Sequence, residues 1–193
     1  MTTGYPQALA LLETRRTIAN FQMAEPGPSE DEIRRIIAAA ARVPDHGKLT
    51  PWRFVLYRGP ARADLDARLA PLYRAKFPGV PAEKAALEET RFSRVPLTIG
   101  VISTATEHVK IPIWEQQLSA GAATMNLMLA AHALGYAAQW LTGWLCYDPD
   151  AAAILGLRAG ERFAGLVCIG TPTVPPVDRP RPAFETIVTE WSA

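Results

Sequence analysis

The sequence predicts one α+β domain spanning residues 1–193, with a mixed central sheet of about four strands flanked by helices. Short apolar segments of strand length are separated by stretches with helical periodicity, which is typical of this class. No Gly-rich turn follows the first expected strand, so a doubly wound dinucleotide fold is disfavoured. Hydrophobic residues make up 49% and charged residues 20% of the chain, as in ordinary globular proteins.

Two helices and a strand are expected in the first third of the chain. Residues 7–13 have helical character, and Ser29 followed by Glu32 is a capping-box pattern that starts a second helix. The apolar face of that helix comprises Ile33, Ile36, Ile37 and Ala40. A strand is predicted over residues 52–57, because proline and glycine bound this apolar run on both sides.

The rest of the chain alternates between helices and strands. Amphipathic or small-residue periodicity predicts helices over residues 61–73, 82–92, 114–134 and 149–155. Short apolar runs predict strands over residues 97–103, 136–141 and 163–169.

The helix expected over residues 114–134 lies in a long uncharged stretch. Residues 116–147 contain no charged side chain, and this length could span a bilayer. However, Asn126, His132 and Gln139 interrupt the stretch, and Gly135 is a typical helix end. We therefore expect a helix buried on several sides, central in the fold, at a subunit interface, or both.

The C-terminal segment, residues 171–193, contains five prolines. Proline donates no backbone hydrogen bond and interrupts both helices and central strands. We therefore expect this segment to form an extended arm.

Charge and cysteine content narrow the function classes. The net charge of +1 provides no overall field that would attract nucleic acid or an anionic membrane. Cys146 and Cys168 have neither metal-ligand nor redox-motif spacing and are expected as reduced thiols of a cytoplasmic protein. The N-terminus lacks the basic and apolar regions of a signal peptide. With three scattered histidines, a metal site is not expected.

Three polar clusters remain as candidate ligand sites. The first is Arg15-Arg16-Thr17, whose guanidinium groups suit a phosphate or a polarised carbonyl, although adjacent arginines are commonly solvated. The second spans residues 42–52 and gathers Arg42, His46 and Lys48 before a strand, where a solvated turn is the alternative. The third, residues 139–143, could flank a ring ligand or belong to a core strand.

Taken in chain order, these clusters resemble the nitroreductase family of FMN-dependent oxidoreductases over nearly the whole chain. Arg15-Arg16-Thr17 is similar to the family's Arg-Arg-Ser, and residues 41–54 are similar to its Ala-Pro-Ser and Gln-Pro-Trp-x-Phe stretch. Further matches are Ala133-Leu134-Gly135-Tyr136, Trp140-Leu141-Thr142-Gly143 and Val167-Cys168-Ile169-Gly170-Thr171-Pro172. Pro44-Asp45-His46 and residues 112–116 look like the short NAD(P)H nitroreductase branch in particular.

The resemblance implies a homodimer with FMN sites at the subunit interface and with C-terminal arms that wrap the neighbouring subunit. NAD(P)H would reduce the flavin, and a nitroaromatic, quinone or related small electrophile would reoxidise it. The flavin carries this chemistry, so no catalytic protein nucleophile is expected.

The resemblance also implies roles for individual residues. The phosphate, the ribityl chain and the polar edge of the flavin would be held by Arg15, Arg16 and Thr17. Arg42 and His46 would reach the flavin too, with His46 coming from the neighbouring subunit. Trp140, Leu141 and Thr142 would lie beside the ring and the phosphate. Arg15, Arg16 and Lys48 would stabilise the negative charge of the reduced flavin.

Three positions depart from the family pattern. Lys48 stands where many members have Asn, Thr50 stands where they have Gln, and Leu141 stands where the short branch can carry Arg. These departures leave two alternatives to an enzyme open. One is a module that stores or senses FMN with little turnover, and the other is a small-molecule-binding protein of the same fold that has lost flavin.

Overall fold

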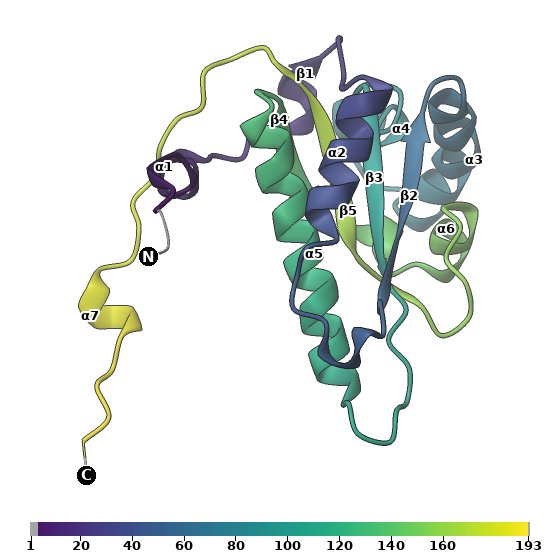
Figure 1. Ribbon diagram of the computed structural model, residues 1–193. Coiled ribbons are helices and arrows are strands. Elements are labelled where there is room, and N and C mark those ends of the chain that lie inside the picture. Colours follow the sequence, from purple (N-terminus) through teal and green to yellow (C-terminus); the bar gives the residue numbers. More distant parts are fainter. Residues whose placement is uncertain (1–3, 193) are drawn as a thin grey trace.

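The structure is a computed structural model that describes residues 4–192 (Figure 1). Its helices are α1 (Pro6–Thr14), α2 (Glu30–Ala40), α3 (Ala61–Lys76), α4 (Ala82–Glu89), α5 (Ile113–Ala133), α6 (Pro149–Ile154) and α7 (Phe184–Ile187). Its strands are β1 (Met23–Ala24), β2 (Trp52–Arg58), β3 (Leu97–Ser103), β4 (Ala137–Leu141) and β5 (Arg162–Pro172). The α+β class and all four predicted strands are thereby confirmed.

The central sheet is organised around β5. Strand β3 pairs with one part of β5 and with β2, while β4 also pairs with β5. Strand β1 extends the sheet at the C-terminal end of β5 and was not predicted, because two residues are too few to show a periodicity. The pairings described within residues 4–192 are antiparallel, so the sheet of a single chain is not mixed in strand direction.

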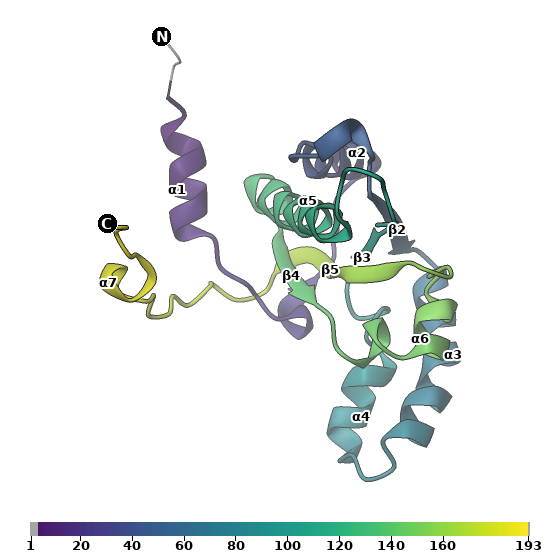
Figure 2. The same cartoon turned by 90° about the horizontal axis from the view of Figure 1, so that it is seen from below.

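Helices cover both faces of the sheet, with α2 and α5 on one side and α3, α4 and α6 on the other (Figure 2). All seven residues of β3 are buried, because side chains that alternate along a strand meet a helical layer on each face. Leu97, Ile99 and Val101 pack with Leu127 of α5 and Ile36 of α2. Ile102 belongs to the cluster on the opposite face.

The start of α2 and the end of α4 have identifiable causes. Helix α2 begins with the predicted capping box, in which the Ser29 backbone N–H donates to Glu32 Oε2 at 2.8 Å. Helix α4 ends at Glu89, three residues before its predicted end. The buried Asp66 carboxylate accepts hydrogen bonds from the backbone N–H groups of Phe92 and Ser93, which holds this segment in a non-helical turn.

Helix α5 is partly covered within one chain. A broad face that includes Ala120, Ala123 and Leu127 is buried, whereas Trp114 and Leu118 are exposed. Within residues 4–192, no helix has both the length and the apolarity that crossing a bilayer requires.

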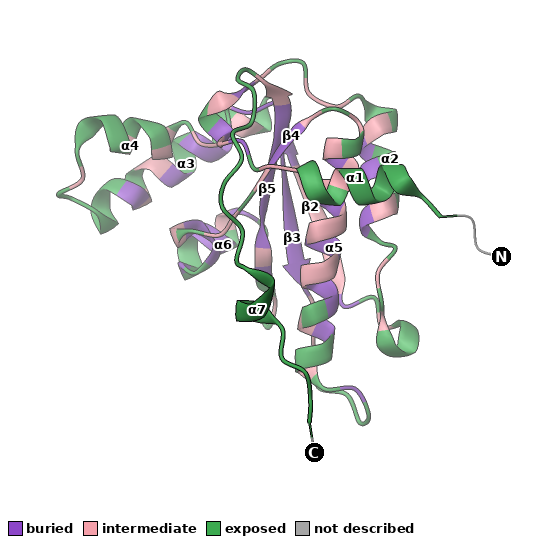
Figure 3. Ribbon diagram, turned by 90° about the vertical axis from the view of Figure 1, so that its left-hand side faces the viewer, coloured by how far each residue is buried: buried purple, intermediate pink, exposed green. Residues whose placement is uncertain are grey.

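Both ends of the chain stand away from the sheet (Figures 1 and 2), and they are largely exposed (Figure 3). Helix α1 contains no buried residue and exposes Leu9 and Leu12. The C-terminal segment is extended apart from the short α7, and it exposes Phe184 and Trp191, the latter to 87%. Large apolar side chains exposed on extended segments indicate surfaces that another molecule covers.

Candidate functional site

At the end of α1, the guanidinium group of Arg15 lies within electrostatic range of three others, from both ends of the sequence. Arg15 follows α1, and its Nε atom is buried without a hydrogen-bond partner in residues 4–192. Burial lowers the pKa of the Arg15 guanidinium from its ordinary value. Three neighbouring cations lower it further, in decreasing order Arg181, Arg16 and Arg179. We call these four residues the guanidinium cluster; a buried unpaired donor among like charges indicates a place for an anion.

The C-terminal segment supplies half of the guanidinium cluster. Arg16 Nε donates to the backbone oxygen of Val177 at 2.9 Å and lies 3.5 Å from Asp178 Oδ1. Arg181 also contacts Asp178, at 3.6 Å. Sequence reasoning missed Arg179 and Arg181, because their segment was interpreted only as an arm. The sequence does show two arginines within three residues. Their position beside Arg15, however, depends on how the whole chain folds.

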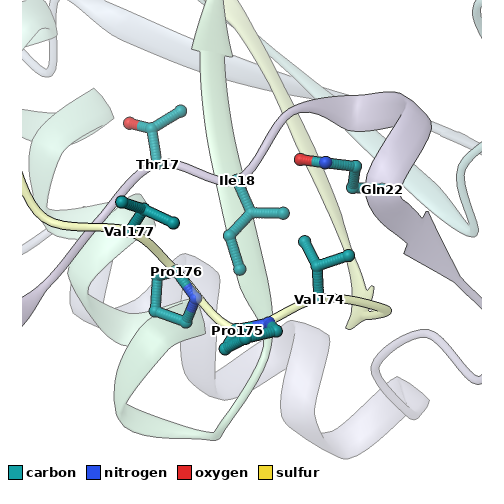
Figure 4. Close-up of a pocket in the computed structure, with 7 residues that line it drawn as sticks. All are labelled: Thr17, Ile18, Gln22, Val174, Pro175, Pro176 and Val177. Atoms are coloured by element: carbon teal, nitrogen blue, oxygen red, sulfur yellow. The ribbon is translucent and has the colours of Figure 1, made fainter.

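Cavities follow the segment from Arg15 to Gln22. One of about 410 Å³ lies between Thr17 and Gln22 on one side and residues 174–177 on the other (Figure 4). A neighbouring cavity of about 240 Å³ is lined by Arg15, Arg16 and His132 and shares Ile18 with the first. A third, of about 220 Å³, is bordered by Leu141 together with Asn20, Phe21, Lys84, Leu87, Glu88, Arg91, Arg94 and Gln139. The predicted Arg15-Arg16-Thr17 cluster therefore lines hollow space.

The predicted segment Trp140-Leu141-Thr142 divides between two faces of β4. Leu141 packs against the buried cluster that contains Ile18, next to the cavities described above. Trp140 points to the opposite face, where its Nε1 donates to the backbone oxygen of Ala164 at 3.0 Å. A side chain at Gly165 would overlap the Trp140 ring. Thr142 is half-buried at the end of the strand. Of these three residues, Leu141 is the one that contacts the Ile18 cluster beside the cavities.

The loop between α2 and β2 has an unusual backbone. Gly47, Lys48 and Thr50 have positive φ angles of 73°, 56° and 50°. For a β-branched residue such as Thr50 this conformation is strained. The Asp45 carboxylate offsets the strain by accepting hydrogen bonds from the backbone N–H groups of Leu49 at 3.0 Å and Thr50 at 2.9 Å. Backbone strain held by specific contacts is concentrated at functional sites.

Three polar side chains on one face of α5 hold this loop. Their contacts are Asn126 Nδ2 to the backbone oxygen of Arg42 at 2.9 Å, Ser119 Oγ to that of Pro44 at 2.7 Å, and Glu115 Oε2 to His46 Nδ1 at 2.7 Å. Residues spaced by four and seven positions share a helix face. The loop is therefore fixed along α5 from Glu115 to Asn126, with Arg42, His46 and Lys48 exposed.

His46 and Arg15 consequently belong to two groups at different ends of α5, and the backbone of Arg42 contacts Asn126 between them. His46 contacts Glu115 in its first turn, whereas Arg15 lines a cavity with His132 in its last turn. About 25 Å of helix separates Glu115 from His132 at the usual rise per residue. One chain alone does not bring the two groups together.

Comparison with known proteins identifies the family. The family model described as Nitroreductase matches residues 12–171. The chain belongs to the nitroreductase family. It is 34% identical over 167 residues to YdjA of Escherichia coli, assigned as an NAD(P)H nitroreductase, with 86% of this chain and 88% of that protein covered. A similarly assigned protein of Haemophilus influenzae is 36% identical over 165 residues, covering 85% and 88%.

Solved structures show the nitroreductase fold. A nitroreductase-like family protein from Bacillus cereus superposes with a TM-score of 0.81 at 21% identity, with both chains covered in full. A protein from Desulfovibrio desulfuricans, assigned as a nitroreductase and crystallised with FMN, superposes with a TM-score of 0.72 at 24% identity. This superposition covers 99% of the present chain and 100% of the other. The family resemblance and the fold expected from it are confirmed.

Proposed function

We propose that this nitroreductase is an FMN-dependent oxidoreductase. It takes a hydride from NAD(P)H and passes electrons to a nitroaromatic, a quinone or a related small electrophile. The observation that carries the proposal is the guanidinium cluster with its buried, unpartnered Arg15 Nε. Two comparisons support it: the relatives assigned as NAD(P)H nitroreductases and the structural neighbour crystallised with FMN.

The residues present fit the parts of FMN. A phosphate dianion matches a cluster of guanidinium groups, because it offers several acceptor oxygens and the opposite charge. We therefore assign the phosphate to the guanidinium cluster, which comprises Arg15, Arg16, Arg179 and Arg181. Thr17 borders the cavity of about 410 Å³, where its hydroxyl can bind the ribityl chain. Leu141 borders the cavity of about 220 Å³, and Thr142 follows it in the chain.

Cations also border the cavity beside Leu141. Lys84 and Arg94 line it, and burial lowers the pKa of Arg94 from its ordinary value. Bound FMN supplies the hydride and electron transfer, while positive charge near its pyrimidine ring stabilises the reduced form. We assign this stabilising role to Lys84 and Arg94, together with the predicted Lys48 from the loop.

We propose that the complete site forms in a homodimer. His46 contacts Glu115, too far along α5 for its side chain to meet the guanidinium cluster of its own chain. A second subunit can bring its loop to that cluster. The exposed apolar side chains of α1, α5 and the C-terminal segment give such a dimer its contact surface.

We propose that the reaction takes place in the cytoplasm. The proposed donor NAD(P)H and the two buried free thiols support this location. Burial raises the pKa of the Cys146 thiol to about 12, which keeps this thiol protonated at neutral pH.

The proposal is tested by flavin binding and bleaching. Purified protein reconstituted with FMN should be yellow, and NAD(P)H should bleach it, with colour returning on addition of a quinone. Replacing Arg15 and Arg16 together by Ala should weaken FMN binding at least about tenfold, because charge-assisted hydrogen bonds contribute roughly 1.5–3 kcal/mol each. The control replaces the exposed Arg34 and Arg68 by Ala. Unchanged FMN affinity in the first variant would remove the phosphate assignment.

An FMN storage or sensor module is the second candidate. It is favoured by Leu141, which packs into a buried cluster and offers no cation where the short branch can carry Arg. This alternative expects a stable yellow protein that consumes negligible NAD(P)H with every acceptor tested. A steady-state assay with several quinones and nitro compounds separates it from the enzyme.

A further inference from the structure

We propose that Glu115 is a positioning residue that fixes the ring of His46 so that its Nε2 atom accepts a hydrogen bond from the flavin bound at the neighbouring subunit. The inference rests on the proposed FMN site and assigns a function to a carboxylate that the sequence left without one. It also specifies how His46 acts, as an acceptor toward an N–H or hydroxyl of the ligand.

The geometry of the pair defines the tautomer. Glu115 Oε2 lies 2.7 Å from His46 Nδ1, the distance of a charge-assisted hydrogen bond. A carboxylate accepts, so Nδ1 carries the proton and, in a neutral ring, Nε2 has a free lone pair. Within residues 4–192 the ring makes no other hydrogen bond. Its Nε2 edge is therefore available to a ligand, since the His46 side chain is 63% exposed.

Hydrogen bonds next to this pair hold the backbone of the loop that carries His46 in place. Ser119 Oγ donates to the backbone oxygen of Pro44 and accepts from Trp52 Nε1 at 3.1 Å, which anchors the loop just before His46. Because the backbone is anchored, the Glu115 contact decides the orientation of the imidazole. Orienting contacts behind a ligand-binding side chain commonly decide how well it binds.

The surface around the pair suits burial against a second copy of the chain. His46 and Glu115 border a cavity of about 330 Å³ whose other lining residues are Pro44, Leu118, Ser119 and Ala122. Leu118 is exposed in the single chain, as is Trp114 nearby on α5. Covering these apolar groups would exclude water from the Glu115–His46 hydrogen bond and strengthen its effect on the ring.

A purely structural function for Glu115 is the competing explanation. Glu115 lies in the first turn of α5, where a carboxylate stabilises the helix through the macrodipole. That function does not involve His46. A test must therefore observe the imidazole itself and ask whether Glu115 acts through it.

The first measurement is the ¹⁵N NMR spectrum of the histidine rings in the flavin-free protein, at a pH where they are neutral. The chain has three histidines, so a His46→Ala variant assigns the His46 signal. We expect a Nδ1-protonated ring in the wild type and a mixture dominated by the Nε2-protonated form in Glu115→Gln. Glu107→Gln, which removes an exposed carboxylate of the preceding loop, is the control. An identical His46 spectrum in Glu115→Gln would refute the proposal.

The second measurement is a double-mutant cycle on FMN affinity. Glu115→Gln should weaken binding about three- to tenfold, the range of a net hydrogen bond, and Glu115→Asp should restore part of the loss. In a His46→Ala background, Glu115→Gln should have no further effect, because Glu115 then has no ring to position. Additive effects, accompanied by an equal loss of thermal stability in both backgrounds, would show a structural function instead.

The two measurements also separate this inference from the proposed function. A wild-type protein that binds no FMN refutes the flavin proposal, whereas the NMR experiment on flavin-free protein still decides the Glu115–His46 geometry. If FMN binds as proposed and the cycle is additive, only the positioning function of Glu115 is wrong.

Discussion

Single residues decide which contacts this protein can tolerate. Arg15 shows this for charge, because its Nε atom is buried beside other cations and is left without an acceptor in residues 4–192. Gly165 shows it for volume, because the Trp140 ring occupies the space that any side chain would need. The indole N–H of Trp140 is satisfied by Ala164, so the ring has a defined position.

A Gly165→Ala variant should therefore be destabilised by about 1–3 kcal/mol, the usual range for an overpacked site. Thermal or denaturant unfolding measures the change. The double variant Gly165→Ala/Trp140→Ala should lose less free energy of unfolding than the sum of the two single variants, because removing the Trp140 ring removes the overlap. A Gly121→Ala variant is the control, because nothing lies within 4 Å of the added methyl. Additive losses would show that Trp140 does not occupy this space.

Helix α2 illustrates how local contacts define an element. Its capping box satisfies backbone N–H groups at the helix start, and Tyr136 adds a hydrogen bond to Glu32 Oε2 at 2.9 Å. These contacts lower the pKa of Glu32 below its ordinary value, chiefly through the backbone N–H of Ser29 and then through its hydroxyl. The ionised carboxylate thus links the helix start to the chain segment after α5.

This pKa shift predicts a pH dependence of stability. Because the folded-state pKa is depressed, the contribution is complete above the ordinary value of 4.5 and is lost as pH falls through the folded-state pKa. We expect the free energy of unfolding to decline less steeply below that value in Glu32→Gln than in the wild type. Urea unfolding at a series of pH values measures this, with Glu107→Gln as a control. Parallel pH profiles for wild type and Glu32→Gln would contradict the expectation.

At the scale of the whole molecule, the two ends of the chain and α5 share one feature: each exposes apolar side chains that a single chain leaves uncovered. The guanidinium cluster includes two arginines of the C-terminal segment, the loop with His46 is exposed, and α5 exposes apolar side chains. The proposed homodimer would cover all three with a single interface.

We therefore expect the protein to elute at about 42 kDa, twice the chain mass of 21.0 kDa. A chain truncated after Thr173 should elute near the monomer mass and lose FMN. Replacing Arg179 and Arg181 by Ala should weaken FMN binding but preserve the dimer, which separates the charge of the segment from its packing. Size-exclusion chromatography with light scattering and a flavin titration give both readouts. A truncated chain that remains dimeric and yellow would exclude the arm from either function.

Much of the fold was accessible from sequence because its signals are local. The pattern Ser29 to Glu32 specifies a helix start within four residues, and the largely apolar run over residues 97–103 specifies the strand β3. Local signals fail where a contact is distant. The end of α4 depends on the buried Asp66, which lies about two dozen positions earlier in the chain. Its carboxylate accepts hydrogen bonds from the backbone N–H groups of Phe92 and Ser93.

The candidate site divides in the same way. Residue types and spacing pointed to Arg15, Arg16 and Thr17 as a ligand cluster, since guanidinium chemistry is a property of the residue itself. That Arg179 and Arg181 join them, that Trp140 and Leu141 face opposite ways, and that Glu115 holds His46 were decided by tertiary structure alone. The physical reason is that sequence specifies chemistry and short-range geometry, whereas the meeting of distant groups depends on how the sheet and α5 fold the chain back on itself.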